Sequence, residues 1–169
     1  GAGLYAVHEA LAAHGRSIPT GTCPTVGTAG LTLAGGLGVD SRRYGLTADR
    51  LVRATVVDGR GRIRTVDASH DADLYWALRG GGSGAAIVTS FTYRTIPATS
   101  MGFFTLSYPA SAAATVVRRW AAWVAEQPSD TWANAHVDVS GSSLSVRVSP
   151  SLMPSRASAA WRIAAVRRW

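Results

Sequence analysis

The chain has 169 residues, of which 47% are hydrophobic and 16% charged, a composition typical of a folded domain rather than a disordered segment. Its formal net charge of +7 rests on 17 basic residues, all arginine, which are scattered and not interleaved with aromatic residues, so we do not expect nucleic-acid binding. No stretch is apolar enough to span a membrane, no signal peptide is visible, and the single cysteine excludes an internal disulfide framework, so compartment and oligomeric state stay unassigned.

The first hundred residues read as a glycine-rich loop set among short helices and strands. Hydrophobic spacing predicts helices or helical turns over residues 4–14, 39–44 and 71–79, with Asp71 as the N-cap of the last. β-Branched runs predict strands over 51–57, 63–66 and 87–96, the first two joined by the turn Asp58-Gly59-Arg60-Gly61. Residues 16–38 are expected to form the loop.

A second group of elements follows a boundary at residues 98–102. The pattern predicts a strand over 103–108, a helix over 115–126 and two antiparallel strands over 132–139 and 144–148. Trp120 and Trp123 have helical spacing and are expected to pack in a core, and the tail from Ser155 has no predicted element. The order of elements indicates an α+β fold rather than a regular βαβ repeat.

Residues 19–38 contain the only cysteine and a dense cluster of glycines. Glycine lets backbone approach a ligand closely, and the N–H groups of such a loop can bind a phosphate, but turns and close packing require glycine too. No window matches a Walker loop or a Gly-x-Gly-x-x-Gly fingerprint. Cys23 is either a small buried residue or a thiolate that reacts with a ligand, and Pro24 favours extended backbone at Cys23.

Four other polar residues have structural interpretations. His8 and His14 are six positions apart and do not share a helix face, so no metal site is expected there. Asp49 is expected to fix the turn before the strand at 51–57, and Arg79 to cap a helix end. The residues alone identify no catalytic acid, base or nucleophile.

Several blocks resemble one protein family. Cys23-Pro24-Thr25-Val26-Gly27, followed by Gly30 and Gly35-Gly36-Leu37-Gly38, resembles the berberine-bridge-enzyme-like oxidases, which belong to the vanillyl-alcohol-oxidase type of FAD proteins with a PCMH-type FAD-binding domain. The resemblance continues at residues 41–49, 73–82 and 88–91, in the family's order, and extends over roughly residues 1–100.

The resemblance implies a domain organisation and an FAD site. Residues 1–100 would be the C-terminal portion of the FAD-binding domain, most of its second subdomain, and residues 101–169 the beginning of an α+β substrate-binding domain. Cys23 matches a cysteine that many members attach to flavin C6, and Ile87 and Val88 match an adenine-side contact. The full set of matching cofactor-binding positions is Cys23, Thr25, Val26, Gly27, Gly30, Gly35, Gly36, Gly38, Ile87 and Val88.

The implied activity is that of an FAD-dependent oxidoreductase, which passes a hydride from an alcohol, sugar or secondary-metabolite substrate to flavin, with dioxygen as oxidant. The family's Arg-Ser-Gly-Gly-His segment and its C-terminal tyrosine segment have no counterpart, Ala34 stands where glycine is common, and residues 84–87 depart from the family pattern. The chain therefore resembles an internal piece of an oxidase, expected to bind FAD weakly on its own. The alternatives are a truncated, inactive chain and a standalone nucleotide-binding module.

Overall fold

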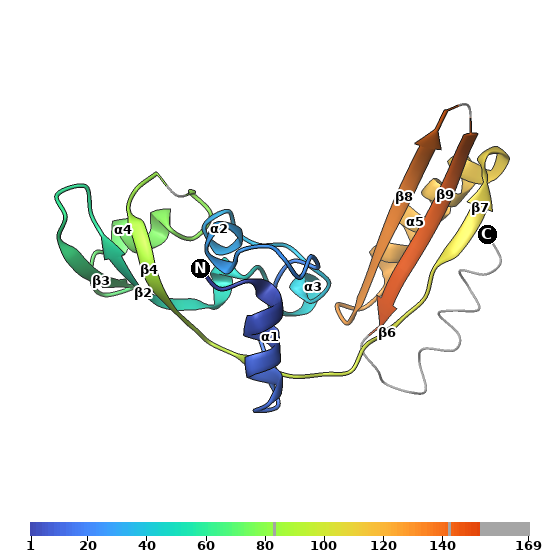
Figure 1. Cartoon of the computed structure of the whole chain (residues 1–169). Helices are drawn as coiled ribbons and strands as arrows, with labels where there is room; N and C mark the ends of the chain where they lie inside the picture. The colour runs from blue at the N-terminus through green and yellow to red at the C-terminus, as the bar shows by residue number, and fades with distance from the viewer. Residues whose placement is uncertain (83, 142, 153–169) are drawn as a thin grey trace. The chain divides into compact units, whose positions relative to one another are not determined.

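The computed structural model describes residues 1–82, 84–141 and 143–152, and the chain divides into two compact units, Gly1–Ala98 and Thr99–Trp169 (Figure 1). Each unit is described by itself below. The predicted tail from Ser155 lies outside the described residues.

The first unit combines short helices with two small antiparallel sheets. Its helices and turns are α1 (Leu4–Ala12), α2 (Thr28–Leu33), α3 (Ser41–Tyr44), a 3₁₀ turn (Ala48–Arg50) and α4 (Ala72–Ala77). Its strands are β1 (Arg16–Ser17), β2 (Leu51–Val57), β3 (Ile63–Asp67), β4 (Ile87–Tyr93) and β5 (Ile96–Pro97). Strands β3, β2 and β4 form one sheet in that order, and β1 pairs with β5 in the other.

The core of the first unit lies between the three-stranded sheet, α4 and the end of α2. Alternation along β2 buries Ala54 and Val56, which pack with Val66 of β3 and with Leu33 and Leu78. Leu74 and Tyr75 of α4 cover the edge of this cluster. Leu33 of α2 packs in this core, so the core fixes the position of α2 relative to the sheet.

The second unit is an antiparallel sheet packed on one helix. It contains β6 (Gly102–Phe103), β7 (Leu106–Pro109), a 3₁₀ turn (Ala110–Ala112), α5 (Ala113–Glu126), β8 (Thr131–Ser140) and β9 (Ser143–Leu152), and β9 pairs with each of the other three strands. Figure 1 shows α5 against the sheet of β7, β8 and β9. Val116 and Trp123 of α5 pack on Val146 and Val148, with Trp120 beside them, so the prediction that both tryptophans pack in a core is confirmed.

The α+β organisation and most predicted elements are confirmed, but the predicted loop at 16–38 is wrong in part because it contains α2. Local propensity for this helix is weak, since Gly30 lies inside it. Tertiary contacts compensate: Leu33 enters the core and the hydroxyl of Tyr93 bonds the hydroxyl of Thr32 at 2.7 Å. The helix therefore depends on residues about sixty positions away.

Two predicted strands are interrupted. The run at 87–96 ends at Tyr93, where the amide of Arg94 donates to the carbonyl of Arg50 at 2.7 Å, and β5 then joins a different sheet. The run at 103–108 splits into β6 and β7, which pair with successive parts of β9. Period-two alternation cannot reveal such breaks, because it persists across them.

Two predicted caps are also corrected. Asp71 stands at the N-cap position of α4, but it has φ +51° and its side chain makes no capping hydrogen bond there. Arg79 lies beyond the end of α4 and donates from Nε to the carbonyl of Ala48 at 3.0 Å, so it ties the 3₁₀ turn to α4 rather than capping its own helix.

Candidate functional site

The segment around Cys23 lies on the N-terminal end of α1. The amides of Leu4 and Tyr5 donate to the carbonyls of Val26 and Pro24 at 2.9 and 3.0 Å, and the carbonyl of Cys23 accepts from the amide of Val26 at 3.2 Å. These bonds use the first free N–H groups of α1 for the loop itself. They hold Cys23 in a turn with its side chain exposed, so the interpretation of Cys23 as a buried hydrophobe is wrong.

The predicted site glycines fall into two classes. Gly35, Gly36 and Gly38 are buried and the fold explains them: Gly35 and Gly36 have φ +100° and +81°, and a Cβ on Gly38 would lie 1.8 Å from the carbonyl oxygen of Thr20. A Cβ on Gly36 would lie 2.2 Å from Oγ1 of Thr47. These three positions need glycine for packing or backbone conformation, whatever they bind.

Gly27 and Gly30 form the second class. Both are exposed, and an added Cβ would meet no described atom within 4 Å at either position. Neither has a positive φ, so the backbone does not require glycine there. Packing within the described chain does not explain these two glycines.

Thr28 lies between these two glycines and carries an unsatisfied group. The residue is 6% exposed, and its Oγ1 has no hydrogen-bond partner within the part of the chain that the structure describes. A buried hydroxyl without a partner is destabilising unless a bound group or water satisfies it. The turn therefore combines one buried hydroxyl without a partner among the described residues with two open backbone positions.

The rest of the predicted binding set is spread over the first unit. Thr25 is exposed and Val26 is 36% exposed, on the same turn as Cys23. Ile87 and Val88 lie at the start of β4, opposite Val57 and Val56 of β2. Ile87 is 71% exposed, whereas Val88 packs against the core. The structure thus gathers the Cys23 turn and the buried glycines in one segment and places the β4 pair on the sheet.

Two residues that hold α2 were missed in the sequence. Oγ1 of Thr32 donates to the carbonyl of Thr28 at 2.8 Å and also meets the hydroxyl of Tyr93 at 2.7 Å. Burial raises the pKa of Tyr93, and the bond to Thr32 opposes that effect. The only sequence signal is the spacing of the two threonines by four residues, since nothing local marks Tyr93 as their partner.

His8 and Asp40 form a second polar group near the same segment. Nε2 of His8 lies 2.7 Å from Oγ1 of Thr20, and Nδ1 lies 3.4 Å from Oγ of Ser17. Burial raises the pKa of Asp40, and the charges of His8 and Arg43 lower it by less. The sequence interpretation placed His8 on a helix face but did not identify these partners.

Asp49 performs the predicted structural role. Its carboxylate accepts from the amide of Leu46 at 2.8 Å, and a Cβ on Gly45 would lie 2.7 Å from the same carboxylate. Gly45 has φ +81°, so the turn before β2 requires both a glycine and this carboxylate. The prediction that Asp49 fixes this turn is confirmed.

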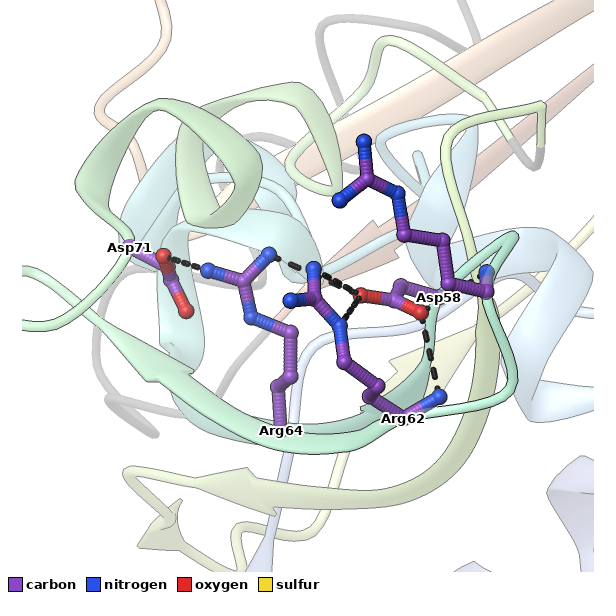
Figure 2. Close-up of polar contacts among 5 residues, drawn as sticks. Asp58, Arg62, Arg64 and Asp71 are labelled. Carbon is purple, nitrogen blue, oxygen red and sulfur yellow. Dashed lines mark hydrogen bonds and ion pairs between the residues drawn. The ribbon is translucent and has the colours of Figure 1, made fainter.

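An arginine–aspartate network stabilises the β2–β3 hairpin (Figure 2). Asp58 accepts from the side chain of Arg62, 2.9 Å from Nε, and from the amides of Arg60 and Arg62. The side-chain bond from Arg62 is the main cause that lowers the pKa of Asp58 to about 2. Figure 2 shows Arg64 between Asp58 and Asp71, and Arg64 pairs with Asp71 at the start of α4. This network fixes the framework and lies outside the predicted site.

Two kinds of feature are absent from the described residues. No helix among them is long and apolar enough to cross a membrane. No group of three or more histidine, cysteine, aspartate or glutamate side chains gathers within residues 1–82, 84–141 and 143–152 in a way that could hold a metal ion.

Comparison with known proteins gives consistent matches. Residues 1–67 match the family model described as FAD binding domain. A glucooligosaccharide oxidase from Sarocladium strictum is 46% identical over 94 residues, which are 56% of this chain and 19% of that protein. The chain spans well under two thirds of the length of the relatives it matches.

Solved structures agree in fold. Wild-type BBE-like 1 from Physcomitrella patens superposes with a TM-score of 0.89 at 28% identity, covering 98% of this chain and 36% of that one. A glucooligosaccharide oxidase from Acremonium strictum, with a 6-S-cysteinyl, 8α-N1-histidyl FAD, gives a TM-score of 0.79 at 28% identity and covers 99% of this chain and 36% of its own.

Proposed function

We propose that the first unit of this chain forms one side of an FAD site in an oxidase acting on a small-molecule alcohol, because residues 1–67 match an FAD binding domain and the fold is similar to that of berberine-bridge-enzyme-like oxidases. One observation carries the proposal: the exposed glycines Gly27 and Gly30 flank the orphan hydroxyl of Thr28, on the same turn as the exposed Cys23. This arrangement lies inside the region that matches the FAD binding domain.

The predicted site residues have different roles in FAD binding. Thr25, Val26, Gly27 and Gly30 give an open backbone surface along which the pyrophosphate of FAD would lie, and Gly35, Gly36 and Gly38 keep that surface in shape. Exposed Ile87 offers apolar area for the adenine side, with Val88 behind it in the core.

FAD, when bound, would supply the redox chemistry, namely hydride acceptance from the substrate with dioxygen as the final oxidant. Cys23 would tether it through a thioether. Forming that bond would remove two electrons and two protons from the thiol and the ring C–H. One dioxygen would accept these two electrons and two protons and become one hydrogen peroxide. The cysteinyl FAD of the Acremonium strictum oxidase supports this role for Cys23.

The substrate is proposed to be a sugar or another small alcohol. The relative from Sarocladium strictum, a glucooligosaccharide oxidase, supports a hydroxylated substrate. Hydrogen peroxide release measured over a panel of oligosaccharides and simple alcohols would identify it. FAD bound without turnover of any compound would instead favour a nucleotide-binding module or an inactive chain.

The decisive test of the cofactor site is an absorption spectrum before and after acid precipitation, on protein expressed from its complete reading frame. We expect flavin absorbance in the native protein and partial retention in the precipitate. Cys23→Ala should release all flavin if Cys23 is the sole tether; if a histidine also holds the flavin, retention should persist and only the absorption spectrum should change. Cys23→Ser, close in size, controls for packing. A colourless protein that cannot be loaded with FAD contradicts the proposal, and unchanged retention with no second anchor contradicts the role of Cys23.

A further inference from the structure

His8 is the side chain through which α1 holds the segment that leads to Cys23. Its Nε2 contacts Oγ1 of Thr20 at 2.7 Å, three residues before the cysteine, and its Nδ1 faces Oγ of Ser17. We assign His8 the tautomer with its proton on Nε2, because the hydroxyl of Thr20 donates to the carbonyl of Gly21 at 3.1 Å and its oxygen can then accept from Nε2–H. Nδ1 is then free to accept from Ser17.

The same segment is attached to α1 on the other side of Cys23 by backbone bonds alone. The amides of Leu4 and Tyr5 hold the carbonyls of Val26 and Pro24. Residues on both sides of Cys23 are therefore hydrogen-bonded to α1. Before Cys23 the bond is made by the side chain of His8, and after it the bonds are made by the backbone of α1.

Thr20 is itself closely packed, so a shift of Thr20 caused by a substitution of His8 would also move the residues around Thr20. Thr20 is 5% exposed, and its carbonyl oxygen abuts Gly38, where a Cβ would come within 1.8 Å. The preceding residue, Pro19, accepts from Oγ1 of Thr47 at 2.8 Å. Movement of Thr20 would thus displace both the approach to Cys23 and the buried end of the glycine segment.

We propose that His8 is a positioning residue for the thiol of Cys23: by fixing Thr20 and Ser17 it sets where the thiol lies relative to a flavin bound on the glycine segment. The part of this inference that concerns flavin rests on the proposed function. His8 touches neither the thiol nor the cofactor surface in its recorded contacts, and it acts through Thr20.

The test measures the segment directly. Amide hydrogen exchange at Tyr5 and Val26, whose amides bond the carbonyls of Pro24 and Cys23, and alkylation of Cys23 by iodoacetamide are compared in His8→Ala, His8→Gln and His14→Ala. Cys23 is the only cysteine, so alkylation reports it alone. His14→Ala is the matched control, because His14 is an exposed histidine in the turn after α1. Thermal unfolding verifies that each variant is folded.

Loss of the hydrogen bond in His8→Ala should raise exchange at Tyr5 and Val26 by about fivefold to tenfold and speed alkylation of Cys23. His8→Gln retains an N–H donor for Thr20 and should restore exchange to within about twofold of the wild type. In protein from the complete reading frame, the fraction of flavin retained after acid precipitation should fall in His8→Ala and recover in His8→Gln.

Equal exchange and alkylation in His8→Ala and His14→Ala would overturn the inference. So would a rise that His8→Gln does not reverse, since helix packing rather than the hydrogen bond would then control the segment. If no variant binds flavin, the proposed function fails on its own, whereas exchange and alkylation still decide whether His8 fixes Cys23. Flavin retention that is unchanged although exchange rises would also overturn the positioning role.

Discussion

At the scale of single residues, glycines that look alike in the sequence have different causes. Gly36 is buried, has φ +81° and lies against Thr47, so the fold itself requires it. Gly30 is exposed inside α2 and has open space at its Cα. Substitution of a glycine of the first kind should change the free energy of unfolding, and substitution of one of the second kind should change ligand affinity.

Gly30→Ala should therefore separate binding from folding. Alanine favours helix by about 0.5–1 kcal/mol over glycine, so the free energy of unfolding should stay the same or rise. The added methyl group would occupy the space proposed for the pyrophosphate, so we expect FAD affinity to fall by about tenfold or more, about 1.4 kcal/mol. Denaturant titration and fluorescence titration with FAD measure the two quantities.

Gly36→Ala is the control with the opposite result. A left-handed φ and a clash with Thr47 should lower the free energy of unfolding by about 2 kcal/mol or more. If Gly30→Ala weakened folding as much as Gly36→Ala, or left FAD affinity unchanged, the division into binding and packing glycines would be wrong.

At the scale of elements, α2 exists because distant residues support it. Tyr93→Phe removes the hydroxyl that bonds Thr32 and should cost about 1 kcal/mol. The loss should be local, so amides of residues 31–34 should exchange faster while those of β2 change little. Phe91→Leu, in the same strand and against the same core, is the matched control that leaves the hydroxyl in place. A uniform change throughout the first unit would show that α2 has no separate stability.

The stability of the β2–β3 hairpin should depend on pH, because two of its carboxylates titrate at a lower pH in the folded state. Hydrogen bonds lower the pKa of Asp58, mainly through the side chain of Arg62, and that of Asp67, mainly through the amide of Ser69, each to about 2. A pKa lowered on folding adds stability above the unfolded value of 3.8, and this stability is lost as pH falls from about 4 to about 2.

Asp58→Asn should accordingly lower the melting temperature near neutral pH and have little further effect near pH 2, where the wild-type carboxylate has lost its advantage. Melting curves over this pH range test the expectation. Asp73→Asn, at an exposed aspartate in the first turn of α4, is the control. A penalty for Asp58→Asn that persists unchanged at pH 2 would show that its charge is not the cause.

At the scale of the whole molecule, the two units have separate cores among the described residues. Val66 and Leu78 belong to one, and Val116 and Val148 to the other. Val148→Ala removes two buried methyl groups and should destabilise the second unit by about 2 kcal/mol.

Hydrogen exchange tests whether the units are independent. In Val148→Ala, amides of β8 and β9 should lose protection while those of β2 and β4 keep theirs, and Val66→Ala should give the reverse pattern. Equal loss in both units from either substitution would indicate one cooperative domain.

The sequence by itself determined the α+β class, the hairpin at 51–67, the helix with Trp120 and Trp123, and the similarity to FAD binding domains, because local periodicity, turn residues and the Cys23–Gly38 block suffice for these. Only the tertiary structure decided that α2 forms, that β4 stops at Tyr93, that Arg79 serves another element and that Gly27 and Gly30 differ from Gly36. Each of these depends on contacts between residues that are not neighbours in the chain: the bond of Thr32 to Tyr93, the bond of Arg94 to Arg50, the bond of Arg79 to Ala48 and the approach of Thr47 to Gly36. No local pattern encodes such contacts, because they arise only when the core brings the segments together.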